Sequence, residues 1–313
     1  MSKQTVSSAL RQEALNTLAT HGKTFYWAAF FLGKDRAALA ALLYTSCRQL
    51  DDIADEPGKG NELRRCVLEQ IKSEIAQSAP TQCHQVSAAW RQLIQLGVDA
   101  EAVSMLIEGL IQDTHLVFFR QQRDLDRYCY RVAGTVGIMM CAVLGVRNRE
   151  AIPYAIDLGI AMQLTNICRD VLEDASLGRR YLPIDVPVEM LRTAQHESRH
   201  EVVEAIDAQL VRAEQFYKSA LSGLIYLPRG SRVAIYLAAI LYRAIGHKLR
   251  ARQYAWWKGR VIVSGAQKLL ITLGALPAMI RLCTASKLKP DSAHSRALHR
   301  YLEGMAYADD QAH

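Results

Sequence analysis

The sequence has little proline, no paired cysteines and no long apolar run. Only 8 of its 313 residues are proline and 50% are hydrophobic, which is typical of a folded globular protein and not of a disordered one. The 7 cysteines are an odd number, and no two have C-x-x-C spacing. This argues against a disulfide framework or a zinc ribbon and favours reduced thiols in a cytoplasmic protein.

Membrane and secretion signals are also missing from the sequence. Residues 1–18 contain no apolar signal-peptide region, and no run of about 18 apolar residues occurs, so we expect no helix that spans a membrane. The formal net charge of +7 suits acidic small molecules, an anionic membrane surface or nucleic acid, and does not choose among them.

The apolar residues recur at helical spacing nearly everywhere, and alternating β-branched strand patterns are absent. We therefore predict one all-α domain over residues 1–313, with its core over about residues 20–270. Turn signals occupy residues 56–60 (EPGKG) and 78–81, and an irregular loop is expected over residues 177–187. The clearest predicted helices cover residues 35–55, 61–78, 99–118, 124–145, 149–174, 198–226 and 231–257.

Two D-x-x-x-D motifs are the most informative feature. The first is Asp51 to Asp55 (DDIAD), and the second is Asp170 to Asp174 (DVLED). Residues four apart lie on one face of a helix, so each motif presents two carboxylates side by side. Further polar residues lie on the same helix faces, N-terminal to each motif. They are Tyr44 and Arg48 before the first motif, and Gln163 and Asn166 before the second.

Both motifs end helices that are apolar almost all round and are therefore expected to be buried. Buried carboxylates are costly unless they are paired or bind a metal ion. Because carboxylate and amide oxygens suit hard cations, the two motifs predict a shared Mg²⁺ or Mn²⁺ site that binds a diphosphate. Ordinary surface acids at helix ends are the alternative reading, and two copies on apolar helices argue against it.

At these residues the sequence resembles the squalene/phytoene synthase family, over roughly residues 20–270. Residues 44–55 (YTSCRQLDDIAD) and 163–174 (QLTNICRDVLED) resemble the two acidic motifs of the family. Three shorter segments also resemble it: residues 21–25 (HGKTF), 128–137 (YCYRVAGTVG) and 178–183 (GRRYLP). Gly22 and Cys168 depart from the usual Ser and Leu of those motifs.

The resemblance implies an isoprenoid-synthase-type helical bundle around a central apolar cavity, and it implies a role for each matching residue. Four aspartates and an amide would bind the metal–diphosphate: Asp51, Asp55, Asp170, Asp174 and Asn166. Gln163 would support the second site, and the diphosphate oxygens would be held by Tyr44, Arg48, Arg169 and Arg260. The prenyl chains would contact Phe25, Tyr128, Val132, Ala133, Gly137 and Tyr242.

The implied activity is that of a prenyltransferase that joins two geranylgeranyl diphosphates head to head to form phytoene in carotenoid biosynthesis. The implied cofactor is Mg²⁺ or Mn²⁺, and no NADPH is expected for phytoene. A C15 reaction that makes squalene or dehydrosqualene stays open, as does a non-catalytic scaffold that binds prenyl diphosphates. We expect peripheral contact with the inner face of the membrane, other enzymes of the pathway as candidate partners, and no nucleic acid.

Three weaker signals remain. Residues 196–200 (HESRH) match the zincin signature H-E-x-x-H, but their polar surroundings favour a solvated helix start. The basic residues between 243 and 260 favour a helix with a snorkelling basic face over a nucleic-acid site. Residues 269–282 predict a core helix or, alternatively, a helix in shallow contact with a membrane. A flexible tail is expected over about residues 285–313.

Overall fold

The computed structural model describes residues 8–77, 84–284 and 293–308, and the turn signal at residues 78–81 lies outside them. Fourteen α-helices and two short strands occur in these ranges. In chain order the elements are α1 (Ser8–His21), α2 (Lys23–Ala29), α3 (Lys34–Ala54), α4 (Asn61–Ala76), α5 (Gln85–Gln95), α6 (Ala100–Asp113), β1 (Val117–Phe118), α7 (Gln122–Cys129), α8 (Thr135–Leu144), α9 (Ile152–Arg169), α10 (Val171–Ser176), β2 (Arg179–Arg180), α11 (Val188–Arg192), α12 (Arg199–Ser222), α13 (Arg229–Ala251) and α14 (Gly265–Thr284).

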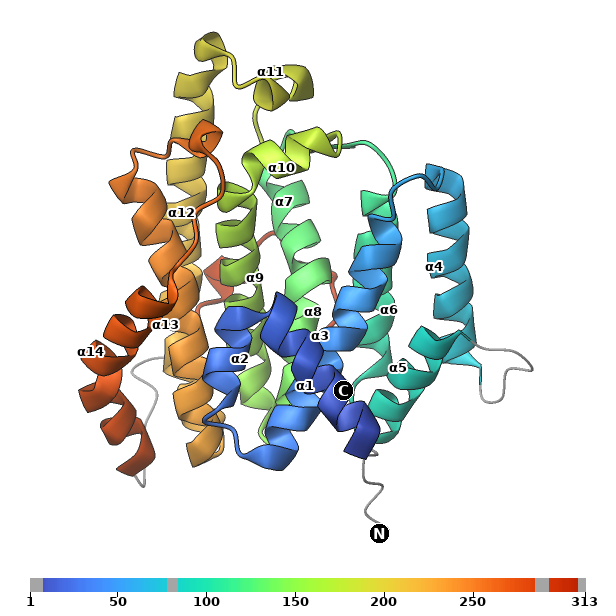
Figure 1. The fold of residues 1–313 in the computed structure, drawn as a ribbon, viewed down its shortest axis with the longest axis vertical. Helices are drawn as coiled ribbons and strands as arrows, with labels where there is room; N and C mark the ends of the chain where they lie inside the picture. Colours follow the sequence, from blue (N-terminus) through green and yellow to red (C-terminus); the bar gives the residue numbers. More distant parts are fainter. Residues whose placement is uncertain (1–7, 78–83, 285–292, 309–313) are drawn as a thin grey trace.

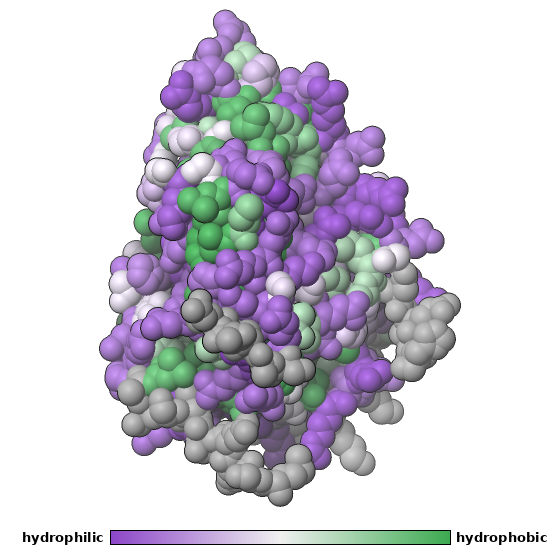
Figure 2. Space-filling view, turned by 90° about the vertical axis from the view of Figure 1, so that its right-hand side faces the viewer, coloured by the Kyte–Doolittle hydropathy of each residue, from purple (hydrophilic) through white to green (hydrophobic). Residues whose placement is uncertain are grey.

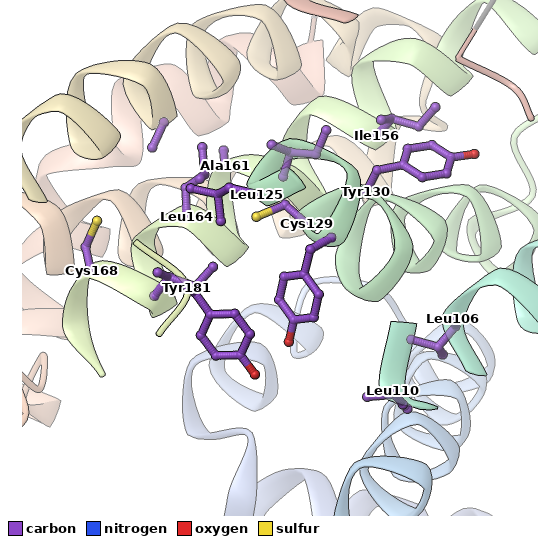
Figure 3. Close-up of a cluster of buried hydrophobic side chains, with 14 of the residues drawn as sticks. Leu106, Leu110, Leu125, Cys129, Tyr130, Ile156, Ala161, Leu164, Cys168 and Tyr181 are labelled. Atoms are coloured by element: carbon purple, nitrogen blue, oxygen red, sulfur yellow. The ribbon is translucent and has the colours of Figure 1, made fainter. Parts of the chain in front are cut away.

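The predicted all-α fold is confirmed, and α9 is its central helix. Helix α9 packs on α8, α12 and α13, and helix α8 also packs on α3 and α6. Most of these helices run along the long axis of the molecule (Figure 1). Side chains of α7 and α9 gather between those two helices, among them Leu125, Cys129, Ala161 and Leu164 (Figure 3). One contiguous apolar core therefore holds the long helices in place.

Most predicted helices match observed ones, and the end of α6 is an informative difference. The pattern predicted helix to residue 118, but α6 ends at Asp113 and the chain continues into β1. Strand β1 pairs in parallel with β2, so Val117 lies opposite Arg179. The Arg179 guanidinium donates to the backbone carbonyl of Asp113 at 2.7 Å and satisfies a carbonyl at the end of the helix. A contact with a residue distant in sequence thus ends this helix, which periodicity alone does not reveal.

A π-helical turn, Tyr130–Gly134, joins α7 to α8, and α8 then crosses α9 at very short range. A Cβ on Gly137 would lie 2.1 Å from the carbonyl oxygen of Ala155, and a Cβ on Gly159 would lie 2.1 Å from that of Ala133. Only glycine fits at either position. The two helices therefore approach each other backbone to backbone, as small residues allow.

The C-terminal residues differ from the expected flexible tail. Residues 293–308 pack on the core, where Leu302 is buried. Arg127 donates to the carbonyl oxygens of Tyr301 and Glu303, and the Tyr130 hydroxyl donates to that of Ala306. The remaining parts of the predicted tail, residues 285–292 and 309–313, lie outside the described residues.

Helix α14 is not the core helix that its apolar composition first indicated. It packs on α13 through one face, which includes Thr272, Ala275 and Met279, and exposes the other. By length and composition it is the one helix in the described residues that could cross a membrane, although the sequence contains no continuous apolar run that predicted such a helix. Only 22% of its most apolar 18-residue stretch is buried. On the opposite side of the molecule, hydrophilic residues dominate and hydrophobic ones form only separate small groups (Figure 2).

Candidate active site

A largely apolar cavity of about 380 Å³ lies among α3, α8, α9 and α13. The predicted channel residues Val132, Ala133 and Gly137 all line it. Further lining comes from apolar side chains of the surrounding helices: Leu106, Leu110, Val136, Met140, Leu144, Leu158, Met162, Leu224, Leu227 and Ile235. Such a wall can hold hydrocarbon chains and exclude water.

One end of this cavity is polar, because two helices present their motif residues there. Helix α3 contributes Tyr44, Arg48 and Asp51, and α9 contributes Gln163 and Asn166. Three aromatic rings lie beside them: the ring of Phe25 lies 5.9 Å from that of Tyr44 and 5.1 Å from that of Tyr242, centroid to centroid. The structure thus brings Asp51 of the first acidic motif, and Gln163 and Asn166 that precede the second, to one cavity with Phe25, Tyr128 and Tyr242. The other expected site residues do not line it: Asp55, Arg169, Asp170, Asp174 and Arg260.

The first acidic motif lies at the end of α3. Arg48 Nη1 lies 3.2 Å from Asp51 Oδ2, and Asp55 Oδ1 lies 2.6 Å from Arg179 Nη2. Burial, followed by the charge of Asp55, raises the pKa of Asp51 to about 6, although Arg48 opposes the shift. The carboxylate of Asp51 is therefore poorly compensated in the protein alone, and a cation would stabilise its charged form.

The second acidic motif spans the break between α9 and α10. Asp170 ends α9, yet the amide of Asp174 still donates to its carbonyl at 2.8 Å, so the two residues remain one turn apart. Arg169 Nε lies 2.7 Å from Asp170, and Arg260 Nε lies 2.9 Å from it. Burial, then the charges of Asp170 and Asp113, raise the pKa of Asp174 well above its usual range.

A buried network that the sequence did not predict connects the two motifs. Asp113 accepts hydrogen bonds from the hydroxyls of Tyr128 and Tyr181, each at 2.7 Å, and burial raises its pKa to about 7. Its charge acts on Asp174, and that of Asp51 acts on Asp113, so both motifs surround this network. Arg179, which pairs with Asp55, also lowers the pKa of Asp174.

A signal for part of this network was present in the sequence. Arg179 and Tyr181 belong to the segment at residues 178–183 that resembles the family, although no role was assigned to them. Asp113 carried no such signal, because an aspartate at the end of a helix is common and its buried position depends on distant tyrosines.

Comparison with known proteins shows the family of the chain. The family model described as squalene/phytoene synthase matches residues 18–267. The chain belongs to this family. It is 33% identical to the 15-cis-phytoene synthase of Pantoea ananas, covering 85% of this chain and 91% of that protein. It is 36% identical to the phytoene synthase of Thermus thermophilus, over 77% of this chain and 83% of the relative.

Solved structures show the same fold. A dehydrosqualene synthase in complex with ligand has a TM-score of 0.72 and 25% identity, covering 87% of this chain and 97% of that one. A squalene synthase from Alicyclobacillus acidocaldarius has a TM-score of 0.67 and 20% identity, over 80% and 97% of the two chains. The fold of this member of the squalene/phytoene synthase family is therefore the all-α isoprenoid synthase fold.

The residues present fit a magnesium ion held partly by substrate. The Asn166 Oδ1 oxygen, in the polar end of the cavity, is buried and accepts no hydrogen bond among the described residues. No three of the motif carboxylates in that part of the chain lie within 4.8 Å of one another. Because Mg²⁺ uses one or two carboxylates together with phosphate oxygens and water, such separated ligands suit ions that a diphosphate bridges.

The zincin-like segment is not a zincin site. His196 belongs to a short 3₁₀ turn, while His200 is exposed on α12 and lies 3.6 Å from Glu204. No third ligand gathers near them in the described residues. Two arginines of α13 pair with acids of α12, Arg243 with Glu214 and Arg250 with Asp207, which fits the predicted packed helix rather than a nucleic-acid site.

Proposed function

We propose that this chain condenses two geranylgeranyl diphosphates head to head to form phytoene and releases diphosphate. The proposal is supported by Asp51, Gln163 and Asn166, which line one apolar cavity, and by Arg179, which pairs with Asp55 and acts on the charges of both Asp51 and Asp174. The names of relatives that match most of the chain at 33% and 36% identity support the C20 substrate.

The metal ligands in this proposal are Asp51, Asp55, Asn166, Asp170 and Asp174. Mg²⁺ or Mn²⁺ bound there would neutralise the negative charge that develops on the departing diphosphate. Arg48, Arg169 and Arg260 already lie among these carboxylates, where they can turn toward phosphate oxygens and donate charge-assisted hydrogen bonds. The Tyr44 hydroxyl remains a neutral donor because burial raises its pKa to about 12.

The apolar cavity protects the cations that the reaction requires. Loss of an allylic diphosphate leaves an allylic cation, and the double bond of the second prenyl chain attacks its C1 atom. The resulting cation loses a proton as the ring closes to a cyclopropyl diphosphate. A second ionisation and a rearrangement follow, and loss of a proton gives phytoene without a hydride donor. Ala133 and Gly137 line this cavity, and the rings of Phe25 and Tyr242 beside it offer cation–π stabilisation.

A C15 reaction is the second candidate, favoured by the similarity to a dehydrosqualene synthase structure. One experiment separates the possibilities. Purified protein is incubated with farnesyl or geranylgeranyl diphosphate, with and without Mg²⁺ and NADPH, and the hydrocarbon is identified by mass. We expect a C40 hydrocarbon that needs Mg²⁺ and no NADPH. A C30 product from farnesyl diphosphate alone would contradict the C20 assignment, and absence of any diphosphate release would leave the non-catalytic scaffold.

We also propose that the protein works at the inner face of the membrane and docks there through α14. Five side chains at helical spacing expose apolar surface on this helix: Leu269, Leu270, Leu273, Leu276 and Ile280. Burial of such a face in the boundary between lipid headgroups and chains is favourable, and a C40 hydrocarbon needs a lipid phase to enter.

Liposome flotation tests this docking. We expect the wild type to float with vesicles and the Leu270→Glu, Ile280→Glu double variant to remain in the dense fraction. Leu63→Glu serves as the control because Leu63 is also exposed but lies on α4. Equal flotation of all three proteins would exclude α14 as the contact.

A further inference from the structure

Two histidines from the C-terminal residues and one aspartate of α9 meet outside the cavity. His294 Nε2 lies 2.8 Å from Asp157 Oδ2, and His299 Nε2 lies 2.8 Å from Asp157 Oδ1. One ligand atom from each of the three side chains lies within 4.8 Å of the others. No residue of this cluster belongs to either acidic motif or lines the cavity.

The cluster is buried and short of positive charge. The Asp157 side chain is 0% exposed, that of His299 5% and that of His294 12%. Burial alone would raise the pKa of Asp157, and hydrogen bonds and charge from His294 and His299 lower it below its usual value. A fully buried carboxylate needs a charged or hydrogen-bonding partner, and in the described residues the ion-pair partners of Asp157 are these two histidines rather than an arginine or lysine.

The contacts of His299 show which of its ring nitrogens can face a metal ion. Its Nδ1 atom lies 3.4 Å from the carbonyl oxygen of Ala308. A ring proton on Nδ1 points at this carbonyl and leaves the Nε2 lone pair facing Asp157 Oδ1 at 2.8 Å, where a metal ion can bind both atoms. A ring proton on Nε2 instead donates to Asp157 Oδ1 in the absence of an ion.

We propose that Asp157, His294 and His299 bind one divalent transition-metal ion of the zinc class. Two neutral imidazoles and one carboxylate are ligands that zinc prefers, whereas Mg²⁺ prefers oxygen alone. The carbonyl of Ala308 orients the His299 ring for metal binding, as outer hydrogen-bond partners of metal-bound histidines commonly do. His294 is the least buried of the three, which leaves a route for the ion and room for a water ligand.

The ion has a structural consequence for the active-site wall. It ties residues 293–308 to α9 beside Tyr154, whose ring meets His294 edge-on at 5.2 Å and whose side chain lines the cavity. The same C-terminal residues cover the π-helical turn through the bond from Tyr130 to Ala306. The site therefore stabilises the back of the cavity without taking part in the reaction.

Metal retention by the full, untagged chain tests the proposal. The protein is stripped with a chelator, loaded with Zn²⁺ in the presence of excess Mg²⁺, desalted and assayed for metal by mass spectrometry. We expect about one zinc ion per chain, and with Co²⁺ in place of zinc we expect visible absorption bands of a low-coordinate site. Zinc should also raise the midpoint of thermal unfolding.

Matched variants locate the ion. His294→Gln and His299→Gln are expected to lose the retained zinc and the thermal shift, while His196→Gln and His200→Gln, which alter exposed histidines outside the cluster, keep both. Asp51→Asn should also keep its zinc, which separates this site from the one proposed for diphosphate. If His299→Gln does not fold, the wild type and His294→Gln decide the question.

Two results would overturn the proposal. Wild-type protein that retains neither zinc nor cobalt would show that a ring proton supplies the positive charge. Undiminished zinc retention in a folded His294→Gln variant would place the ion elsewhere. Neither result bears on the proposed phytoene synthesis, which is measured separately with Mg²⁺.

Discussion

The buried residue Asp113 contacts two tyrosines and an arginine beside the candidate active site. It accepts the hydroxyls of Tyr128 and Tyr181, whose rings stack at 4.7 Å, and its backbone carbonyl accepts from Arg179. Arg179 in turn pairs with Asp55. Asp113 thus helps to position Asp55 through Arg179, although Asp113 is distant in sequence from both motifs.

The pH dependence of stability tests this network. Folding raises the pKa of Asp113 from about 4 to about 7, so between these values the folded protein binds a proton that the unfolded chain does not. The free energy of unfolding therefore falls as pH rises from about 4 to about 7 through this group. We expect Asp113→Asn, followed by urea unfolding in metal-free buffer, to show a flatter profile over that range. An unchanged slope would contradict the assignment.

At the scale of single residues, the sequence could predict the motifs but not their partners. The four aspartates were visible because spacing on a helix is local information. Arg260 was also expected near the diphosphate, and the structure places it 2.9 Å from Asp170. Asp113 and the Asp157–His294–His299 cluster could not be found, since each depends on residues that are distant in sequence.

Helices α8 and α9, which both line the cavity, cross at very short range. Periodicity predicted both helices but could not reveal the π-helical turn or the closeness of the two backbones. These follow from Gly137 and Gly159, at which any side chain would overlap a carbonyl group of the facing segment.

Substitution of the crossing glycine tests this contact. Gly137→Ala would place its Cβ 2.1 Å from a backbone oxygen, so the helices must separate. We expect a loss of about 1–3 kcal/mol in the free energy of unfolding, measured in urea. Gly274→Ala is the control, because no atom lies within 4 Å of its added Cβ, and its stability should be equal or slightly higher. Equal stability of both variants would refute the close crossing.

At the scale of the whole molecule, cavity depth decides the length of the prenyl chain. Helix α13 runs along the cavity from Tyr242, beside the diphosphate end, to Ile235, about 10 Å farther along the helix. The sequence predicted an apolar cavity but not its depth, which is set by side chains from several helices together.

A bulky residue at the far end should shorten the preferred substrate. We expect Ile235→Trp to reduce kcat/KM for geranylgeranyl diphosphate by about 10-fold or more while farnesyl diphosphate is affected less, since one or a few lost methylene contacts are worth about 1–3 kcal/mol. Tyr236→Trp is the control, because Tyr236 packs toward α14 instead. If both substrates lose turnover equally in Ile235→Trp, the cavity does not measure chain length there.

The central proposal is that aspartates from two helices that are distant in sequence bind one diphosphate through divalent ions. The most direct measurement is Mg²⁺-dependent diphosphate release by Asp51→Asn and Asp170→Asn, with folding verified by circular dichroism and with Asp52→Asn as a neighbouring control. Asp52 is more than half exposed, whereas Asp51 lines the cavity and the Asp170 side chain is only 17% exposed. We predict that each motif variant loses more than about 100-fold in kcat and remains folded, while the control loses much less. Near-normal turnover in either Asp51→Asn or Asp170→Asn would contradict the account.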